Sequence, residues 1–153
     1  MVICSFVGHK LARSDLMKEV ITEVEKIVLA SDESVFYSGS MGDFDKICEQ
    51  AVRETKKKYP DRKICLCKVL PSYGYIKDKQ EQDFLKRLYD EVFVCSASDG
   101  AHYKAMIGKR NRWMMEQSDY IIAYVKYDSG GACRTLRYAQ RLGKKIFRVG
   151  NEE

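Results

Sequence analysis

Two kinds of segment alternate along the chain. Short apolar runs rich in Val, Ile, Phe and Tyr recur six times, as "MVICSFV", "SVFY", "KICLCKVL", "EVFVC", "YIIAYV" and "KIFRV". Several runs are continuous rather than alternating, which is typical of strands covered on both faces of a sheet. The pattern therefore predicts six short strands, several of them buried.

The segments between these runs have helical periodicity. Leu16, Val20, Val24 and Val28 recur every four residues, and apolar positions spaced i, i+3, i+4 and i+7 continue through 44–55. Shorter patterns predict helices that begin near Asp78, span about 103–114 and occupy 136–142, the last ended by a glycine and two lysines. Since strands and helices alternate, we predict an α/β fold with a mainly parallel sheet and right-handed crossovers.

Length and composition indicate one globular domain over residues 1–153. Hydrophobic residues are 45% and charged residues 32% of the chain, a balance that argues against disorder. No window approaches the ~20 uninterrupted apolar residues of a membrane helix. The N-terminus "MVICSFVGHK" has neither the basic region nor the cleavage site of a signal peptide. We therefore expect a cytoplasmic protein with no membrane partner.

Six cysteines raise the question of a disulfide framework or a metal site. Four of them stand in apolar, strand-like runs, where a reduced thiol behaves as a small core residue; they are Cys4, Cys65, Cys67 and Cys95. A zinc site would need a second cysteine pair or neighbouring histidines, and the two histidines stand apart at positions 9 and 102. The expectation is reduced, buried thiols and no metal.

Three glycine turns follow predicted strands and precede predicted helices. They read "FVGHK", "FYSGSMGDFD" and "YDSGGACRT". In a parallel sheet these turns share the carboxyl edge, where ligands bind at the point at which the winding reverses. Glycine permits a close backbone approach, and the helix N-terminus that follows favours a negative group such as phosphate. Together the turns predict an anion-binding cleft.

Each turn also has a purely structural interpretation. Gly8 serves as well for a plain strand-end turn, and Asp43 as an N-cap for the second helix. The pair Gly130–Gly131 is harder to explain structurally, because Thr135 and a neighbouring arginine add donors suited to phosphate. None of the turns matches G-x-G-x-x-G or G-x-x-x-x-G-K-[ST], which disfavours a conventional NAD enzyme or ATPase.

Several motifs together resemble the YpsA-like branch of the SLOG superfamily over nearly the whole chain. They are "FVGHK", "FYSGSMGDFDKICEQAV", the "YP" segment with its strand and "LP" loop, "RNRWMMEQSDYIIAYV" and "GGACRTLRYAQRLGKKI". This resemblance implies a Rossmann-like three-layer sandwich that binds nucleotides or nucleotide derivatives at the glycine turns. The superfamily also includes LOG-type phosphoribohydrolases, DprA-type DNA-processing proteins and sensors of NAD-derived signals.

The leading hypothesis is a module that binds a phosphorylated nucleotide or nucleotide derivative, similar to ADP-ribose or NAD, without a resident cofactor. Within "RNRWMM", the Arg fork suits a phosphate and the Asn a base or ribose edge, whereas the Trp is expected to pack in the core. The predicted ligand-binding residues are Gly8, His9, Lys10, Gly39, Ser40, Gly42, Asp43, Arg110, Asn111, Gly130, Gly131 and Thr135. Family habit suggests a homodimer.

Two alternatives belong to other function classes. One is a nucleotide N-glycosidase, although the acidic residues that follow G-G-x-G-T in LOG enzymes are missing here. Asp43 or Asp45 could supply the carboxylate that this cleavage needs. The preferred interpretations, however, are a helix cap for Asp43 and a solvated first-turn acid for Asp45. The other is a DprA-like DNA-binding module. Residues 101–150 carry 11 Lys and Arg but 3 Asp and Glu, while no stripe of aromatics is interleaved with them.

Overall fold

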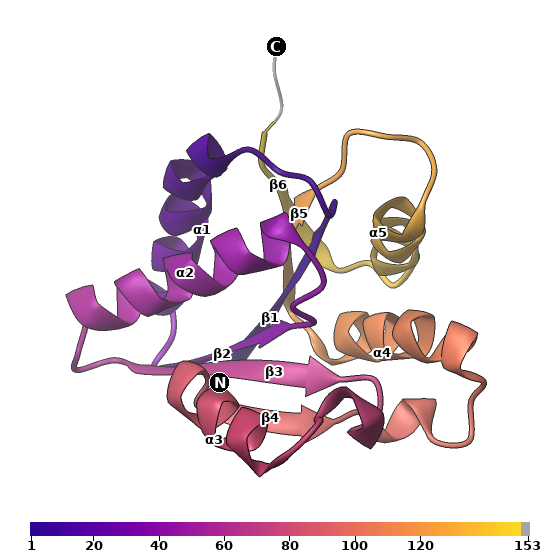
Figure 1. The fold of residues 1–153 in the computed structure, drawn as a ribbon. Coiled ribbons are helices and arrows are strands. Elements are labelled where there is room, and N and C mark those ends of the chain that lie inside the picture. Colours follow the sequence, from indigo (N-terminus) through magenta and orange to yellow (C-terminus); the bar gives the residue numbers. More distant parts are fainter. Residues whose placement is uncertain (151–153) are drawn as a thin grey trace.

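The computed structural model describes residues 1–150, which form a single six-stranded sheet (Figure 1). Its strands run in the order β4-β3-β2-β1-β5-β6, and every neighbouring pair is parallel. The strands are β1 (Val2–Gly8), β2 (Glu33–Ser38), β3 (Lys63–Leu70), β4 (Glu91–Val94), β5 (Tyr120–Tyr124) and β6 (Lys145–Arg148). The six predicted strands are confirmed, and the sheet is wholly rather than mainly parallel.

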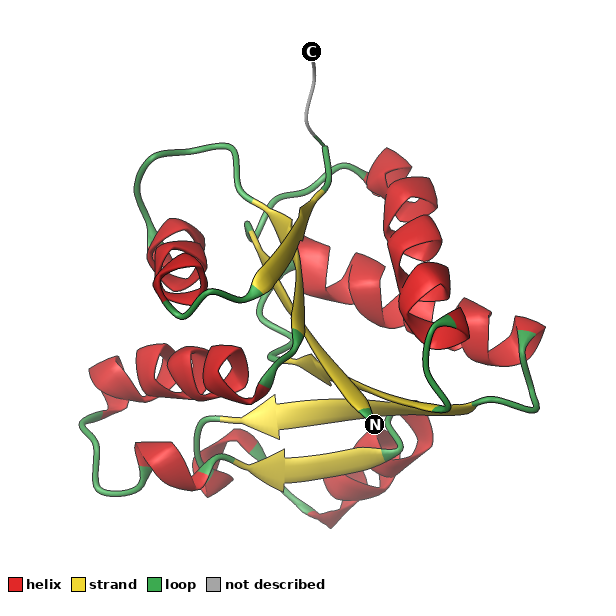
Figure 2. Ribbon diagram, turned by 180° about the vertical axis from the view of Figure 1, so that it is seen from behind, coloured by secondary structure: helices red, strands yellow, loops and turns green. Residues whose placement is uncertain are grey.

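Five α-helices flank the sheet in two outer layers (Figure 2). They are α1 (Met17–Leu29), α2 (Asp43–Lys58), α3 (Lys79–Leu88), α4 (Tyr103–Gln117) and α5 (Gly131–Arg141), with short 3-10 turns at Ser14–Leu16, Tyr73–Tyr75 and Ser96–Ser98. Helices α1, α2 and α3 cover one face, and α4 and α5 cover the other. The predicted Rossmann-like α/β sandwich is confirmed.

Each face of the sheet has its own apolar core. On the α1–α2 side, Phe6 and Phe36 stack across neighbouring strands and Phe44 of α2 packs with them. On the α4–α5 side, Met114 and Met115 pack against the central strand β5. The central strands therefore carry apolar side chains on both faces, which is why their runs in the sequence are continuous.

Helix α4 does not bury one continuous apolar face. Tyr103 stands at its first position but is exposed, whereas Arg110 is buried between the apolar residues that anchor the helix. The helix reaches the sheet only with its second half, because its first half lies beyond the strand ends (Figure 1). Trp113 packs beside Tyr37 and Phe93, so the expected core role of the Trp agrees with the structure.

The winding of the sheet reverses next to β1. The chain builds outward from β1 through β2, β3 and β4, and α4 then carries it back to β5 on the other side of β1. Such a reversal leaves a crevice at the carboxyl ends of the central strands. Within residues 1–150, no helix has the length and apolar character needed to cross a membrane.

Candidate functional site

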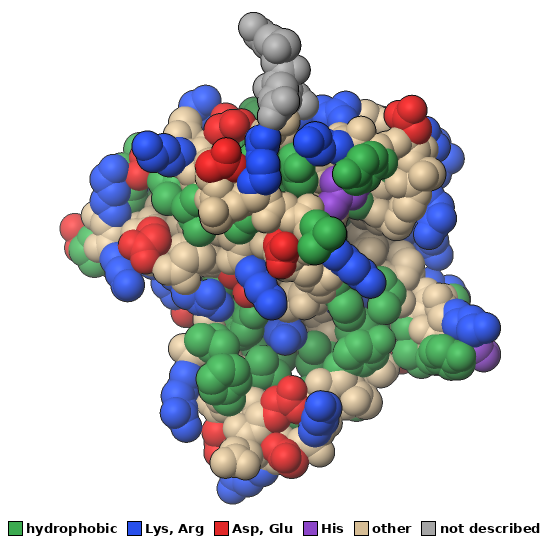
Figure 3. Space-filling model, turned by 45° about the horizontal axis from the view of Figure 1, so that its top comes forward, with side chains coloured by type: hydrophobic (Ala, Val, Ile, Leu, Met, Phe, Trp, Pro, Cys, Tyr) green, Lys and Arg blue, Asp and Glu red, His purple; other side chains and the backbone are tan. Residues whose placement is uncertain are grey.

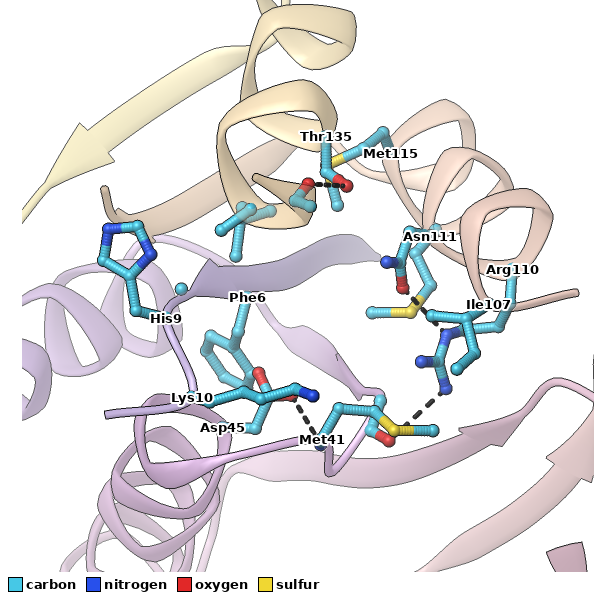
Figure 4. A pocket seen from close by; sticks show the side chains of 16 residues that line it. Phe6, His9, Lys10, Met41, Asp45, Ile107, Arg110, Asn111, Met115 and Thr135 are labelled. Carbon is cyan, nitrogen blue, oxygen red and sulfur yellow. Dashed lines mark hydrogen bonds between the residues drawn. The ribbon is translucent and has the colours of Figure 1, made fainter. Parts of the chain in front are cut away.

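A pocket of about 300 Å³ lies at this reversal, between the ends of β1 and β2, the N-termini of α2 and α5, and the inner face of α4 (Figure 4). Its volume is at the lower end of the range for small-molecule sites. The pocket gathers eight of the twelve predicted ligand-binding residues: Gly8, His9, Lys10, Gly39, Arg110, Asn111, Gly131 and Thr135. Segments from all three glycine turns therefore meet in one place.

The three lining glycines serve different purposes. A Cβ at Gly8 would overlap the ring of Phe44, and a Cβ at Gly39 would lie 2.8 Å from Cζ of Arg110. These two positions need glycine for close packing, so the structural interpretation accounts for them. A Cβ at Gly131 would meet nothing within 4 Å, so this glycine leaves an open space at the start of α5.

Helix α5 presents its N-terminus to the pocket. Gly131 and Ala132 line it, and the amide N–H groups of a first helical turn have no partner within the helix. The helix dipole adds a partial positive charge there, which favours an anion. The hydroxyl of Thr135 donates to the Gly131 carbonyl at 3.0 Å, so its hydrogen is used inside the helix and is not the free phosphate donor that the sequence suggested.

Arg110 forms the opposite wall of the pocket, and its guanidinium is not free to bind a phosphate as the sequence suggested. Its side chain is 1% exposed, and Nη1 donates to the Val69 carbonyl at 2.7 Å and to the Gly39 carbonyl at 3.3 Å. Nε donates to Oδ1 of Asn111 at 2.9 Å, which leaves the amide nitrogen of Asn111 directed into the pocket. Burial lowers the pKa of Arg110, and nearby Asp45 opposes that shift.

Asp45 is a pocket residue that the sequence analysis assigned to solvent. Its side chain is half-buried in the first turn of α2, and Oδ2 accepts a hydrogen bond from the Met41 amide at 2.9 Å. Burial raises the pKa of this carboxyl to about 6, with a further contribution from the charge of Glu49, while the Met41 amide and Arg110 act against the rise. The interpretation of Asp45 as a solvated first-turn acid is wrong.

His9 and Lys10 line the pocket from the turn after β1. Nε2 of His9 accepts from the Lys126 amide at 2.7 Å, which ties the β1 turn to the loop before α5. Burial lowers the pKa of His9, and the charge of Lys126 adds to this, so the neutral ring with its proton on Nδ1 is favoured. Lys10 is exposed, and its side chain extends across the pocket beside Asp45 (Figure 4).

Four of the predicted residues lie outside the pocket lining: Ser40, Gly42, Asp43 and Gly130. The hydroxyl of Ser40 points to the core, where it bonds Glu49 and Tyr89. Its φ of 53° is in the left-handed region, and these bonds hold the β2–α2 turn in that conformation. Ser40 therefore stabilises the β2–α2 turn from the core side and does not line the pocket.

Gly42 and Asp43 join the first and second turns to each other. A Cβ at Gly42 would lie 2.6 Å from Cα of Lys10. Asp43 is the first helical residue rather than the N-cap: its amide donates to the Lys10 carbonyl at 2.8 Å, and its Oδ2 accepts from the Ala12 amide. The expected cap is thus replaced by a bridge between loops. Gly130, with φ of 100°, precedes α5 and sets the approach of Gly131.

The apolar lining of the pocket was not predicted from the sequence. Met41, Ile107, Met114 and Met115 line it beside Phe6. Met114 fell within the helix predicted over about 103–114, and Met41 stood in a glycine-rich turn with no periodicity to mark it. On the molecular face in Figure 3, apolar side chains gather around a hollow, and Lys and Arg side chains stand about it.

A wider groove of about 620 Å³ continues from the pocket between α4 and α5. The two share Ile107, Asn111, Gly131 and Thr135. The groove is also lined by five basic side chains, those of Lys104, Arg112, Arg134, Arg137 and Arg141, and by no acidic one among the described residues. The basic C-terminal third of the sequence is therefore concentrated beside the candidate site.

No protein-family model matches the sequence, and no curated protein sequence matches it. Among solved structures, DNA processing protein A (DprA) from Streptococcus pneumoniae is similar, with a TM-score of 0.70 and 17% identity over 97% of this chain and 50% of that one. DprA from Helicobacter pylori, described for its single-stranded DNA binding mode, has a TM-score of 0.66 and 17% identity over 96% and 64% of the two chains.

This chain shares its Rossmann-like α/β fold with part of each DprA chain. It spans about half to two thirds of the DprA chains that it matches. A molybdenum cofactor carrier protein from Chlamydomonas reinhardtii is also similar, with a TM-score of 0.57 and 15% identity over 96% and 75% of the two chains. These structures support the predicted Rossmann-like fold, whereas membership of the SLOG superfamily, its YpsA-like branch, the single-domain assignment and the homodimer stay predictions.

Proposed function

We propose that the pocket binds a phosphorylated nucleotide or a nucleotide-derived ligand such as ADP-ribose or NAD. The observation that carries the proposal is the convergence of three unlike surfaces on one hollow: the open N-terminus of α5 at Gly131, the carboxylate of Asp45 and the apolar wall around Ile107. These surfaces suit a phosphate, ribose hydroxyls and a base, respectively.

The charged groups around the pocket support this arrangement. Lys10 extends over the hollow beside Asp45 and adds positive charge there, while the amide nitrogen of Asn111 can donate to a base or ribose. Arg110 acts indirectly: by bonding the Gly39 carbonyl it holds the β2 turn against α4, and so keeps the pocket walls in place. The volume of about 300 Å³ suits one nucleotide moiety, and the groove beside it leaves room for a second.

The test is titration with a panel of nucleotides, ADP-ribose and NAD, followed by calorimetry and thermal shift. A ligand at 100 times its Kd should stabilise the protein by about 2.7 kcal/mol. Gly131→Glu should abolish the response, because it places a carboxylate where the phosphate would sit; the position is open and acidic residues suit a first helical turn, so folding should be preserved. Gln140→Glu, exposed near the other end of α5, is the matched control.

A response that survives Gly131→Glu unchanged would place the ligand elsewhere. The absence of a response to every member of the panel, with the wild-type protein folded, would contradict the proposal.

Single-stranded nucleic acid is the second candidate ligand, and the α4–α5 groove favours it. Five basic side chains line a channel that opens from the pocket, and a similar structure is described as binding single-stranded DNA. Fluorescence anisotropy with a labelled oligonucleotide should show that affinity falls as the salt concentration rises. The slope of log affinity against log salt concentration should become shallower in Arg134→Glu. Lys57→Glu, a charge reversal at an exposed position of α2, should change neither the affinity nor its salt dependence.

Catalysis as a nucleotide N-glycosidase would depend on Asp45. The ionised carboxylate of Asp45 is the kind of group that steadies an oxocarbenium-like centre, and with a pKa of about 6 it is ionised above that pH. Release of free base from a nucleoside monophosphate or NAD, measured by chromatography, would establish the activity. Asp45→Asn should then lose turnover but retain weaker binding, because the amide oxygen can still accept from a ribose hydroxyl. If neither protein releases base, the site binds without cleaving.

A further inference from the structure

The structure brings three potential metal ligands together on the α4 side of the sheet, at β3 and β4. Sγ of Cys65 and Sγ of Cys67 are 3.5 Å apart, and Sγ of Cys67 is 3.8 Å from Oε2 of Glu91. The three ligand atoms all lie within 4.8 Å of one another, and this is the one such group of His, Cys, Asp and Glu found in residues 1–150.

The sheet itself produces this arrangement. Cys65 and Cys67 are two residues apart on β3, so their side chains share one face. Glu91 is the first residue of β4 and pairs with Cys67 in the parallel register. Since strand register fixes which residues stand side by side, the third ligand comes from a residue that lies 24 positions along the chain.

We propose that Cys65, Cys67 and Glu91 form a binding site for a thiophilic divalent cation, Zn²⁺, separate from the nucleotide pocket. A tetrahedral site with Zn–S of about 2.3 Å and Zn–O of about 2.0 Å needs ligand separations of about 3.8 Å between sulfurs and about 3.5 Å between sulfur and oxygen. The observed separations of 3.5 and 3.8 Å differ from these by a few tenths of an ångström. Two thiolates and a carboxylate leave the fourth position to water.

The surroundings favour a cation. The two thiols and the Glu91 carboxyl stand within 4.8 Å of one another, and a bound Zn²⁺ would replace the thiol protons. The charged neighbours are Asp90 and Lys56, which pair with each other at 2.5 Å. Tyr37 of β2 stands in register beside Cys67.

The proposed site is also accessible to an ion from solvent. Cys67 is buried, but Cys65 is half-buried and Glu91 is exposed, so the site opens to solvent on the β4 side. Four other cysteines, Cys4, Cys48, Cys95 and Cys133, are buried as free thiols in the cores. In the described structure these four have no comparable set of acidic partners, and they behave as the small core residues expected from the sequence.

The test is a Zn²⁺ titration of the reduced full-length protein in competition with a chromophoric chelator, with Co²⁺ as a spectroscopic probe. One Zn²⁺ per chain is expected, with a thiolate-to-cobalt charge-transfer band. Cys65→Ser should weaken binding by about 100-fold or more and remove that band, and Glu91→Gln should weaken it by about tenfold while keeping the band. Cys133→Ser, in α5, is the matched control and should bind as the wild type does.

Cys65 and Glu91 are the partly open positions, so these two variants keep the test valid if Cys67→Ser does not fold. A wild-type protein with verified reduced thiols that takes up no Zn²⁺ would overturn the proposal. Binding that Cys65→Ser and Glu91→Gln leave intact would overturn it equally. Neither outcome bears on nucleotide binding, because the pocket lining includes none of the three ligands.

Discussion

Replacing Asp45 by Asn should stabilise the protein above pH 6 and remove a pH-dependent part of its stability. The carboxyl is half-buried at the start of α2, and burial raises its pKa from 3.8 to about 6. The folded state therefore prefers the protonated acid. Asn has nearly the same shape, is neutral at every pH, and can still accept the hydrogen bond from the Met41 amide.

The size and sign of the effect follow from this pKa. Between pH 3.8 and 6 the folded state binds more protons at Asp45 than the unfolded chain does, so the free energy of unfolding falls as pH rises through that window. Above pH 6 the full destabilisation by the ionised carboxylate is present. A rise in pKa from 3.8 to about 6 corresponds to about 3 kcal/mol. Because the side chain retains some contact with water, we expect a gain of about 1–3 kcal/mol for Asp45→Asn at pH 8.

The assay is urea unfolding of the wild type and Asp45→Asn at several values between pH 4.5 and pH 8. The stability difference should be smallest at the acid end and should level off above about pH 7. Asp43→Asn, which removes a carboxylate from the same helical turn, is the control for loss of a favourable charge near the α2 N-terminus. A difference that does not change with pH, or an Asp45→Asn protein less stable than wild type at pH 8, would refute the reasoning.

Three further substitutions test how the pocket walls are held. Gly8→Ala should cost at least about 2 kcal/mol in urea unfolding, because its Cβ would overlap the ring of Phe44. Arg110→Ala should cost about 3 kcal/mol or more by the same measurement, since two backbone carbonyls lose their buried donor. Tyr89→Phe should lower the melting temperature through a loss of about 1–2 kcal/mol, because the phenol donates to Glu49 at 2.7 Å. An unchanged stability in any of them would contradict the packing or bonding given for it.

The fold could be predicted because its signals are local. Continuous apolar runs mark the central strands, and the four-residue spacing of Leu16, Val20 and Val24 marks a helix with one buried face. The glycine turns could be placed at one edge of the sheet because parallel strands leave no other arrangement. These inferences need only the period of a pattern and the rules of α/β topology.

The directions of individual side chains could not be predicted in the same way. Ser40 and Asp45 stand in the same turn region, yet Ser40 turns to Glu49 in the core and Asp45 turns to the pocket. The buried Glu49 lies nine positions along the chain from Ser40, and nothing in the sequence identifies it as the partner. Arg110 likewise finds its acceptors 41 and 71 positions away. Pairing with residues that the sequence pattern does not identify decides these cases.

The sign of pH dependence in ligand binding can show which part of the ligand contacts Asp45. A ribose hydroxyl that donates to the carboxylate favours its ionised form, so affinity should rise by up to about tenfold per unit as pH increases towards 6, and level off above. A phosphate beside Asp45 would favour the protonated acid and reverse the slope. Calorimetry with a pyrophosphate ligand such as ADP-ribose avoids the phosphate titration near pH 6, and Asp45→Asn should flatten whichever slope is seen.

We expect the rising slope, because the phosphate site that the geometry supports is the N-terminus of α5, on the other side of the pocket (Figure 4). A falling slope that Asp45→Asn abolishes would reverse the orientation of the ligand, and a slope that Asp45→Asn leaves intact would remove Asp45 from the site.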